Sequence, residues 1–492
     1  MKTHARTAFE GKRQCYFSSF SSFHCHVRPI AIYLPIELLP LVFQHLTKPG
    51  HLAKICTVNK TCYTFAIELL YQKIFIYSWH KNSKSKVVKL LETLDRAPRL
   101  AKFVQELSIR DFPRALLRGQ RDELLQVCLR GIRNCMNLRI CTWTRDGSLS
   151  EDILEALQQL PLLSELEMNG HNQGQYRAIE LIKFNHLQKI SLIMPSSPVV
   201  TIMPRWMQIT GSTLRHLSLI CKSSPLINDS LLAEIAPNLV NLEQLYIVGC
   251  PKATHDGVRV IVEASQKGLV SLGMEGISPT FDMEHFAKEC HAKQTLTRLR
   301  SITLTVPITS QSTTAWMRHV ELLLSSSSLQ HFHISTVGGE VSQEFDTKFC
   351  ERIVRVHGNT LRRVSVHRLR MSIEAIDLIC RLCPHLQQLF IVLNHDNLEL
   401  LKPCLLHTRE LRVLHINRPL SSNETVPMVS AEKALTVVNA CASELYQIGF
   451  NTRVWQVERE IGTNSDGTLR IERKLGPYEL PQIPEQFLVV RT

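Results

Sequence analysis

The chain has 492 residues, of which 44% are hydrophobic and 21% are charged. This balance is typical of a soluble protein that folds around a buried core, and no apolar run approaches the roughly 18 residues that a membrane helix needs. The net charge is +13, yet the basic residues are not interleaved with aromatic ones in the repeated way typical of nucleic-acid binders. We therefore expect neither a membrane nor a nucleic acid as a partner.

The cysteine content bears on the compartment. The chain contains 15 cysteines, an odd number, and most of them lie beside leucines within periodic segments. No apolar stretch followed by a small-residue cleavage site marks a secretory signal. We expect buried, reduced cysteines rather than a disulfide framework, and a cytoplasmic or nuclear location.

Residues 1–30 are basic, carry several serines and show no helical periodicity. A disordered leader is the favoured interpretation of this segment. A mitochondrial presequence shares this composition and is the alternative.

Residues 31–80 are predicted to form a small all-helical module. Pro35 suits the first turn of a helix, where its missing N–H is not needed. An apolar face at helical spacing follows it, made of Leu38, Leu39, Val42, Phe43 and Leu46. Pro49 and Gly50 end this helix, and a second apolar stripe begins at Leu52.

The same segment resembles an F-box. The opening Leu-Pro-x-Glu-Leu-Leu of that family is matched by Leu34, Pro35, Glu37, Leu38 and Leu39. Further on, Val58 and Lys60 fit the family pattern, whereas Cys62 stands at its tryptophan position. The resemblance implies that the module binds an SKP-type adaptor, and through it a cullin, by way of Leu34, Pro35, Glu37, Leu38, Leu39, Phe43, Leu46 and Val58. A helical cap on the first repeat, with no adaptor, is the alternative.

A leucine repeat occupies most of the remaining chain. The pattern apolar-x-x-apolar-x-apolar recurs thirteen times, from Val104 to Phe450, at intervals of 24 to 34 residues. Its alternating second half predicts a short strand with one buried face. Helices are predicted between the copies, for example at 230–235, 257–264 and 373–382. The first of these follows Asn228 and Asp229, either of which could cap it.

A unit of one strand and one helix cannot bury its own apolar face, so such units must stack. The segment Leu242–Gly257, with Cys250 at the turn after the strand, resembles a cysteine-containing leucine-rich repeat. We therefore predict an α/β fold in which residues 81–450 form a leucine-rich-repeat solenoid. It should be a horseshoe of about thirteen strand–helix units with the strands on its concave side.

Residues 451–492 are predicted to form a terminal β-hairpin and a tail. Val454–Glu460 and Thr468–Arg473 alternate on either side of Asn464–Gly467, as is typical of a hairpin with a tight Asp-Gly turn. We expect the hairpin to cover the open strand edge of the last repeat. Three prolines mark the tail as loose: Pro477, Pro481 and Pro484.

Motifs of catalysis are missing from the sequence. It contains no Gly-rich phosphate loop, no paired-histidine metalloprotease signature and no Gly-x-Ser-x-Gly elbow. Cys380 and Cys383 form a Cys-x-x-Cys pair without a second ligand pair at zinc spacing, so core packing is favoured over a metal site. We expect a protein that is not an enzyme and has no catalytic residue, no cofactor and no metal.

The concave face is the candidate site for a protein client. The third, fifth and seventh positions of each unit should face it, because side chains alternate along a strand. These positions place His331, His333, Arg363 and His367 in one basic patch, with exposed Phe390 and Tyr246 on either side. Arg363 would offer a bidentate fork to an acidic or phosphorylated segment, and the histidines would add pH sensitivity. A solvated face without a ligand is the simpler alternative, and a metal site at His331 and His333 is a third.

The sequence as a whole predicts a non-catalytic, substrate-recognition subunit of an SKP–cullin–F-box ubiquitin ligase, with an unidentified protein client. The alternative is a leucine-rich-repeat scaffold that binds proteins independently of any ubiquitin ligase. A nucleic-acid binder attracted by the positive charge is the third and least favoured class.

Overall fold

The computed structural model describes residues 35–46, 48–117, 122–307, 313–336, 344–419, 429–464 and 466–478. The leader predicted at 1–30, Leu34 and most of the predicted tail, 479–492, lie outside the described residues.

One sheet of 16 strands runs through the molecule in chain order. The strands are β1 (Lys73–Ile76), β2 (Glu106–Ile109), β3 (Ile140–Trp143), β4 (Glu165–Asn169), β5 (Lys189–Ile193), β6 (His216–Ile220), β7 (Gln244–Val248), β8 (Ser271–Glu275), β9 (Ser301–Val306), β10 (His331–Thr336), β11 (Arg363–His367), β12 (Gln388–Val392), β13 (Val413–Asn417), β14 (Gln447–Phe450), β15 (Arg453–Thr463) and β16 (Leu469–Pro477). Neighbouring strands from β1 to β14 are parallel.

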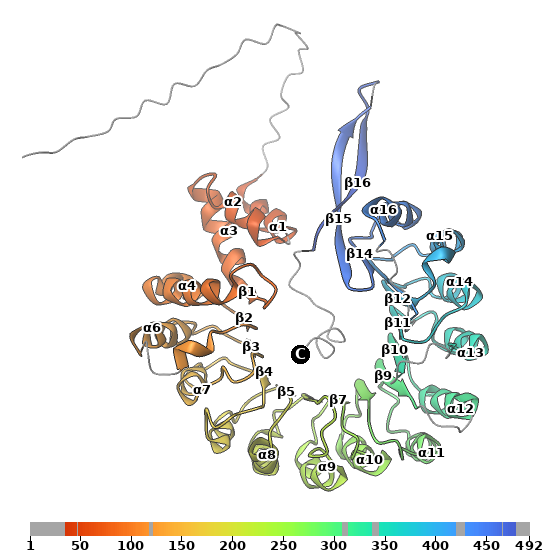
Figure 1. Ribbon diagram of the computed structural model, residues 1–492, viewed down its shortest axis with the longest axis horizontal. Helices are drawn as coiled ribbons and strands as arrows, with labels where there is room; N and C mark the ends of the chain where they lie inside the picture. Colours follow the sequence, from red (N-terminus) through yellow and green to blue (C-terminus); the bar gives the residue numbers. More distant parts are fainter. Residues whose placement is uncertain are drawn as a thin grey trace, which may run out of the picture.

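Helices alternate with these strands. They are α1 (Leu39–Gln44), α2 (Pro49–Ile55), α3 (Lys60–Gln72), α4 (Ser83–Arg96), α5 (Pro98–Ala101), α6 (Asp122–Arg133), α7 (Glu151–Gln158), α8 (Ser197–Thr210), α9 (Asp229–Ile235), α10 (His255–Ala264), α11 (Met283–Lys293), α12 (Thr313–Leu324), α13 (Thr347–His357), α14 (Ile373–Leu382), α15 (Leu398–Leu405) and α16 (Ala431–Ala440). The strands line the inner side of a curved, nearly closed horseshoe, and the helices form its outer side (Figure 1). The fold is a leucine-rich-repeat solenoid, as predicted.

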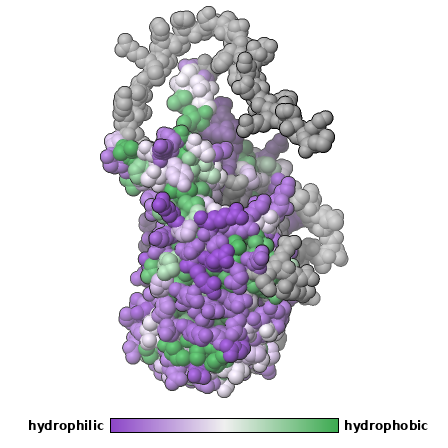
Figure 2. Space-filling view, turned by 90° about the vertical axis from the view of Figure 1, so that its left-hand side faces the viewer, coloured by the Kyte–Doolittle hydropathy of each residue, from purple (hydrophilic) through white to green (hydrophobic). Residues whose placement is uncertain are grey.

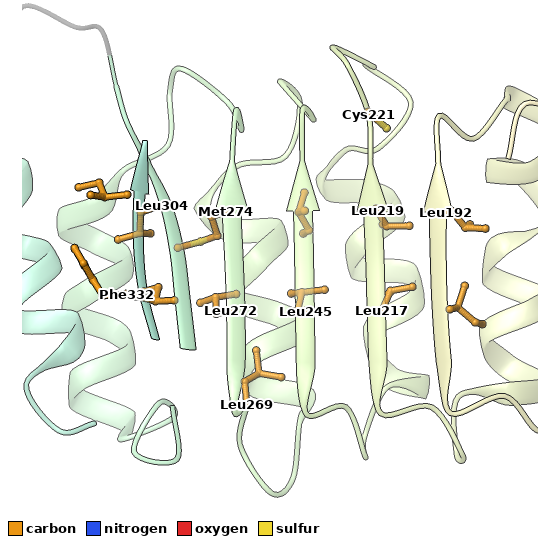
Figure 3. Close-up of a cluster of buried hydrophobic side chains, with 14 of the residues drawn as sticks. Leu192, Leu217, Leu219, Cys221, Leu245, Leu269, Leu272, Met274, Leu304 and Phe332 are labelled. Carbon is orange, nitrogen blue, oxygen red and sulfur yellow. The ribbon is translucent and has the colours of Figure 1, made fainter. Parts of the chain in front are cut away.

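The repeated leucines build one continuous core. Leu217, Leu245 and Leu272 lie in register on three neighbouring strands and have no exposed surface. Figure 3 shows such residues as rows that cross from strand to strand. Burying each leucine stabilises the fold by about 1.5–3 kcal/mol, so the rows hold consecutive units together.

The predicted strands and helices are confirmed. Every leucine-pattern strand is present, as β2 to β14, and the three predicted helices are α9, α10 and α14. The cap of α9 is Asn228, whose side chain accepts a hydrogen bond from the N–H of Leu231 at 3.0 Å. Thr254 and Ser372 cap the other two helices in the same way. Each such cap satisfies a backbone donor that has no partner inside its helix.

The sheet begins one strand earlier than the leucine pattern indicates. β1 lies within residues 31–80, where only helices are predicted, and it pairs with β2 from Lys73 opposite Glu106 to Ile76 opposite Ile109. The helix α3 leads directly into this strand. The N-terminal helices are therefore continuous with the solenoid rather than separated from it by a linker.

The chain closes with the predicted hairpin. β14 pairs antiparallel with β15, and β15 pairs antiparallel with β16. The hairpin thus covers the edge of the last parallel strand, as expected. The Nζ atom of Lys48, just before α2, lies 2.5 Å from a carboxylate oxygen of Glu458 on β15. This ion pair joins the two ends of the horseshoe, which face each other in Figure 1.

Candidate interaction surfaces

The three N-terminal helices α1, α2 and α3 enclose a small core of their own. Phe43, Leu52 and Ala66 are buried together, and Leu39 and Leu46 pack against them partly buried. Pro49 occupies the first turn of α2, a position that suits proline because its missing N–H needs no partner there. Pro49 and Gly50 therefore begin the second helix, while α1 already ends at Gln44.

The outer side of these helices is unusually apolar. Six hydrophobic side chains are between 39% and 66% exposed: Ile36, Leu38, Leu41, Val42, Val58 and Tyr63. We call this set the N-terminal apolar surface. In Figure 2, hydrophobic residues lie among hydrophilic ones over the N-terminal helices, in the upper part of the view. Several exposed apolar side chains on one small folded module are typical of a docking surface.

The residues expected to contact an adaptor divide into two groups. Pro35, Glu37, Leu38 and Val58 are exposed, and Val58, at 66%, is the most exposed residue of the N-terminal apolar surface. Phe43 is only 6% exposed, so the structure gives it the role of a core residue that supports this surface from beneath. Leu39 and Leu46 share that supporting role.

The concave face brings together the histidines and the arginine predicted to form a patch. His331 lies opposite Arg363, and Ser335 lies opposite His367, on the adjacent strands β10 and β11. The hydroxyl of Ser365 lies 2.9 Å from Nδ1 of His333 and 3.0 Å from Nε2 of His367. The two imidazole rings are 4.9 Å apart. The predicted clustering is therefore confirmed.

Phe390 continues this cluster on β12. Its ring lies 6.1 Å from that of His367 and stacks on the ring of His415 at 5.8 Å. The guanidinium carbon of Arg363 lies over the Phe390 ring, 4.9 Å from the ring centroid. The expected exposure of Phe390 is wrong, because the side chain is completely buried. Rings on neighbouring strands cover one another when they lie flat across the sheet.

Glycines make room for these flat rings. A Cβ atom on Gly449 would lie 2.1 Å from Nδ1 of His415, and a Cβ on Gly273 would lie 2.3 Å from Cδ1 of Tyr246. Either contact is far inside van der Waals distance. The two glycines are therefore required by the rings beside them.

Tyr246 belongs to a separate group. It lies on β7, with β8 and β9 between it and the histidine strand β10, and it stacks on His216 at 5.4 Å. The expectation that Tyr246 borders the basic patch is therefore wrong. The concave face carries two ring clusters, one on β6–β7 and one on β10–β13.

The cluster is less basic than the sequence indicates. Burial lowers the pKa of His331, and burial together with the nearby His367 and Arg363 lowers the pKa of His333 well below its usual value. Burial also lowers the pKa of His367 to about 3. The lowered pKa values favour neutral imidazoles near physiological pH, so Arg363 supplies the positive charge of the cluster, and any pH response of these histidines is shifted below neutrality.

The histidine, cysteine and acidic side chains of the described residues bear on metal binding and on thiol chemistry. No cluster of three or more histidine, cysteine or acidic side chains could hold a metal ion among these residues. Cys380 and Cys383 are buried in the core, as predicted from their spacing. Burial raises the pKa of both thiols, that of Cys383 to about 12. Such thiols stay protonated and are poor nucleophiles.

Among the helices that the structure describes, none is both long enough and apolar enough to cross a bilayer.

Comparisons with known proteins give similarities to solved structures only. No protein-family model matches the sequence, and no curated protein matches it. The solved complex of TLR13 with ssRNA13 contains a similar chain, with a TM-score of 0.36 and 12% identity, over 64% of this chain and 46% of that one. The yeast Rad7 and Elc1 complex gives a TM-score of 0.45 and 13% identity, over 75% and 88% of the two chains. The leucine-rich repeat-containing protein LegL7 from Legionella pneumophila gives 0.32 and 12%, over 68% and 89%. At these identities the likeness concerns the fold alone.

Sequence reasoning missed several members of these surfaces. Ile36, Leu41 and Tyr63 of the N-terminal apolar surface were not singled out, although Leu41 lies next to the predicted apolar face. His216 and His415, which stack on Tyr246 and Phe390, were not among the residues predicted for the concave site. Aligning the fifth position of every repeat would have placed His415 beside Phe390, since these residues are opposite each other on β12 and β13.

Proposed function

We propose that this chain is a non-catalytic, substrate-recognition subunit of an SKP–cullin–F-box ubiquitin ligase. The observation that supports the proposal is the N-terminal apolar surface, exposed on a small helical module with a core of its own. A helical cap serving only the first repeat would turn its apolar side chains toward that repeat. Here Val58 and Leu41 point to solvent, at 66% and 55% exposed, which suits docking of a partner.

The module and the concave face have different tasks in this proposal. The N-terminal apolar surface binds the adaptor, and through it the cullin. The concave face binds a protein client through Arg363, with exposed His331 beside it. Function then follows from proximity, because the client's lysines are held at a high effective concentration near the conjugating enzyme.

Adaptor binding is tested by capture of a purified SKP-type adaptor on the immobilised full chain. Replacing Leu38 and Val58 with aspartate should weaken capture by about a hundredfold, since charges would be buried against an apolar partner. Leu406→Asp is the matched control, because Leu406 is equally apolar, 71% exposed and lies after α15 on the outer flank. Failure of the unmodified chain to capture adaptor would favour the independent scaffold instead.

Client binding is tested with an array of acidic peptides, each with and without phosphoserine. Arg363→Glu should reduce retention of the bound peptides about tenfold or more, since it reverses the charge contributed by the cluster. Arg355→Glu makes the same change on α13, where the side chain is 70% exposed, and should retain them. Equal retention by both variants would remove Arg363 from the client site.

A further inference from the structure

The terminal hairpin projects away from the curved body of the molecule (Figure 1). Its far end carries three apolar side chains that are 71–75% exposed: Ile461, Leu469 and Ile471. Ile461 lies opposite Ile471 in the β15–β16 ladder, and Thr463 lies opposite Leu469. Because cross-strand partners share a face of the sheet, these apolar residues form one exposed patch.

The outer edge of β16 is open in the part of the chain that the structure describes. β16 ends the sheet, and among these residues no further strand pairs with it. An open edge of this length presents unpaired N–H and C=O groups to any complementary strand.

The ladder shows which backbone groups face that edge. The N–H of Asn464 donates to the carbonyl of Thr468 at 2.8 Å, so these two residues form a hydrogen-bonded pair. Hydrogen-bonded and non-bonded pairs alternate along an antiparallel ladder. Leu469, Ile471 and Arg473 therefore direct their N–H and C=O groups away from β15, toward the open edge.

We propose that β16 pairs antiparallel with β16 of a second copy of this chain, in a register centred on Ile471. In this register Ile471 faces Ile471 of the second copy, and the outward backbone groups of the two strands meet. The exposed apolar patches of the two copies then lie side by side on one face of the extended sheet, with the two Ile471 side chains as neighbours. A two-fold interface of this kind is self-complementary, as most protein dimers are.

Charge selects this register. When Ile471 faces its own equivalent, the residue before it faces the residue after it in the second copy. Arg470 then lies opposite Glu472 of the second copy, and Glu472 lies opposite Arg470 of the second copy. Centring on Glu472 would oppose Glu472 to itself and Arg470 to Lys474, and centring on Arg470 would oppose Arg470 to itself. Like charges directly opposite each other destabilise a strand pair.

Contacts at the base of the hairpin disfavour a register shifted toward the body. The guanidinium of Arg473 donates to the carbonyls of Val438 and Cys441 at the end of α16, at 2.6 and 3.0 Å. A register centred on Arg473 would oppose two arginines and bring the second copy toward α16. Centring on Ile471 leaves the two horseshoes at opposite ends of the paired hairpins.

The test is the mass of the full chain in solution, measured by sedimentation over a concentration series up to about 100 µM, which covers weak dimers. The unmodified chain should show a monomer–dimer equilibrium. Arg470→Glu and Glu472→Arg should each weaken dimerisation about tenfold or more, since each creates two like-charge contacts. Mixing these two variants should restore dimers, because each supplies the charge that the other needs.

Lys474→Glu is the matched control. It makes the same charge change as Arg470→Glu but faces the uncharged Thr468 of the second copy, so dimerisation should persist. Circular dichroism and the melting temperature check that every variant folds. A chain that stays monomeric at all concentrations would overturn the proposal, and so would dimers that persist in both single variants or fail to return on mixing.

Discussion

The solenoid and the N-terminal helices are both rich in leucine but use it in opposite ways. Leu272 on β8 has no exposed surface, whereas Leu41 in α1 is 55% exposed. In the solenoid the repeat strands lie beside one another and are covered by helices, so the leucines of the repeat pattern on these strands have neighbours on all sides. The three N-terminal helices can cover only a few residues with their own small core. A leucine count alone therefore does not distinguish a core from a docking surface.

The largest effect should come from deleting a leucine in the solenoid. Leu272→Ala should lower the free energy of unfolding by about 2–5 kcal/mol, because it leaves a cavity between stacked units. Leu41→Ala in the N-terminal module should change it by less than about 0.5 kcal/mol. Urea unfolding followed by circular dichroism measures both. Similar losses in the two variants would mean that Leu41 is covered in solution.

A smaller effect should come from a buried polar residue of the solenoid, His367, through the pH dependence of the free energy of unfolding. The pKa of His367 is about 3 in the folded chain, below its usual value near 6.5. Between these values the unfolded chain binds more protons than the folded chain. The free energy of unfolding should therefore fall as the pH drops from about 6.5 toward 3, by at most about 1.4 kcal/mol per pH unit for this group.

His367→Gln removes that titration while keeping a side chain that can bond the Ser365 hydroxyl. Its free energy of unfolding should depend less steeply on pH than that of the unmodified chain, and above pH 7 the two slopes should agree. Urea unfolding at a series of pH values from about 4 to 8 provides the comparison. Parallel curves over the whole range would show that His367 is already protonated in the folded chain or accessible to solvent.

The sequence predicts the solenoid well because its signal is repeated. Leu217 and Leu245 occupy equivalent positions in neighbouring units. Because the units stack, these side chains can be buried only on the side of the sheet that faces the core. β1 was not predicted, because Lys73–Ile76 follows helix α3 without the full leucine pattern. The cap of α9 is predicted to within one residue, since Asn228 and Asp229 both suit the position.

The site residues were less predictable because the residues that surround them come from distant parts of the sequence. Alternation along β12 places Phe390 on the concave face, but its burial depends on Arg363 and His415, which come from other repeats. The low pKa of His367 likewise has burial as its main cause, which periodicity does not reveal. The pairing of Lys48 with Glu458 joins residues 410 positions apart, and nothing in the sequence connects them.

That pairing has a consequence for how the molecule unfolds. In an open repeat array each unit contacts only its neighbours, so the two terminal units unfold independently of each other. Here the Lys48 side chain is only 11% exposed where it meets Glu458, so loosening the last strands also removes a support from the first helices. Fraying at one terminus is thereby transmitted to the other without passing through the units between them.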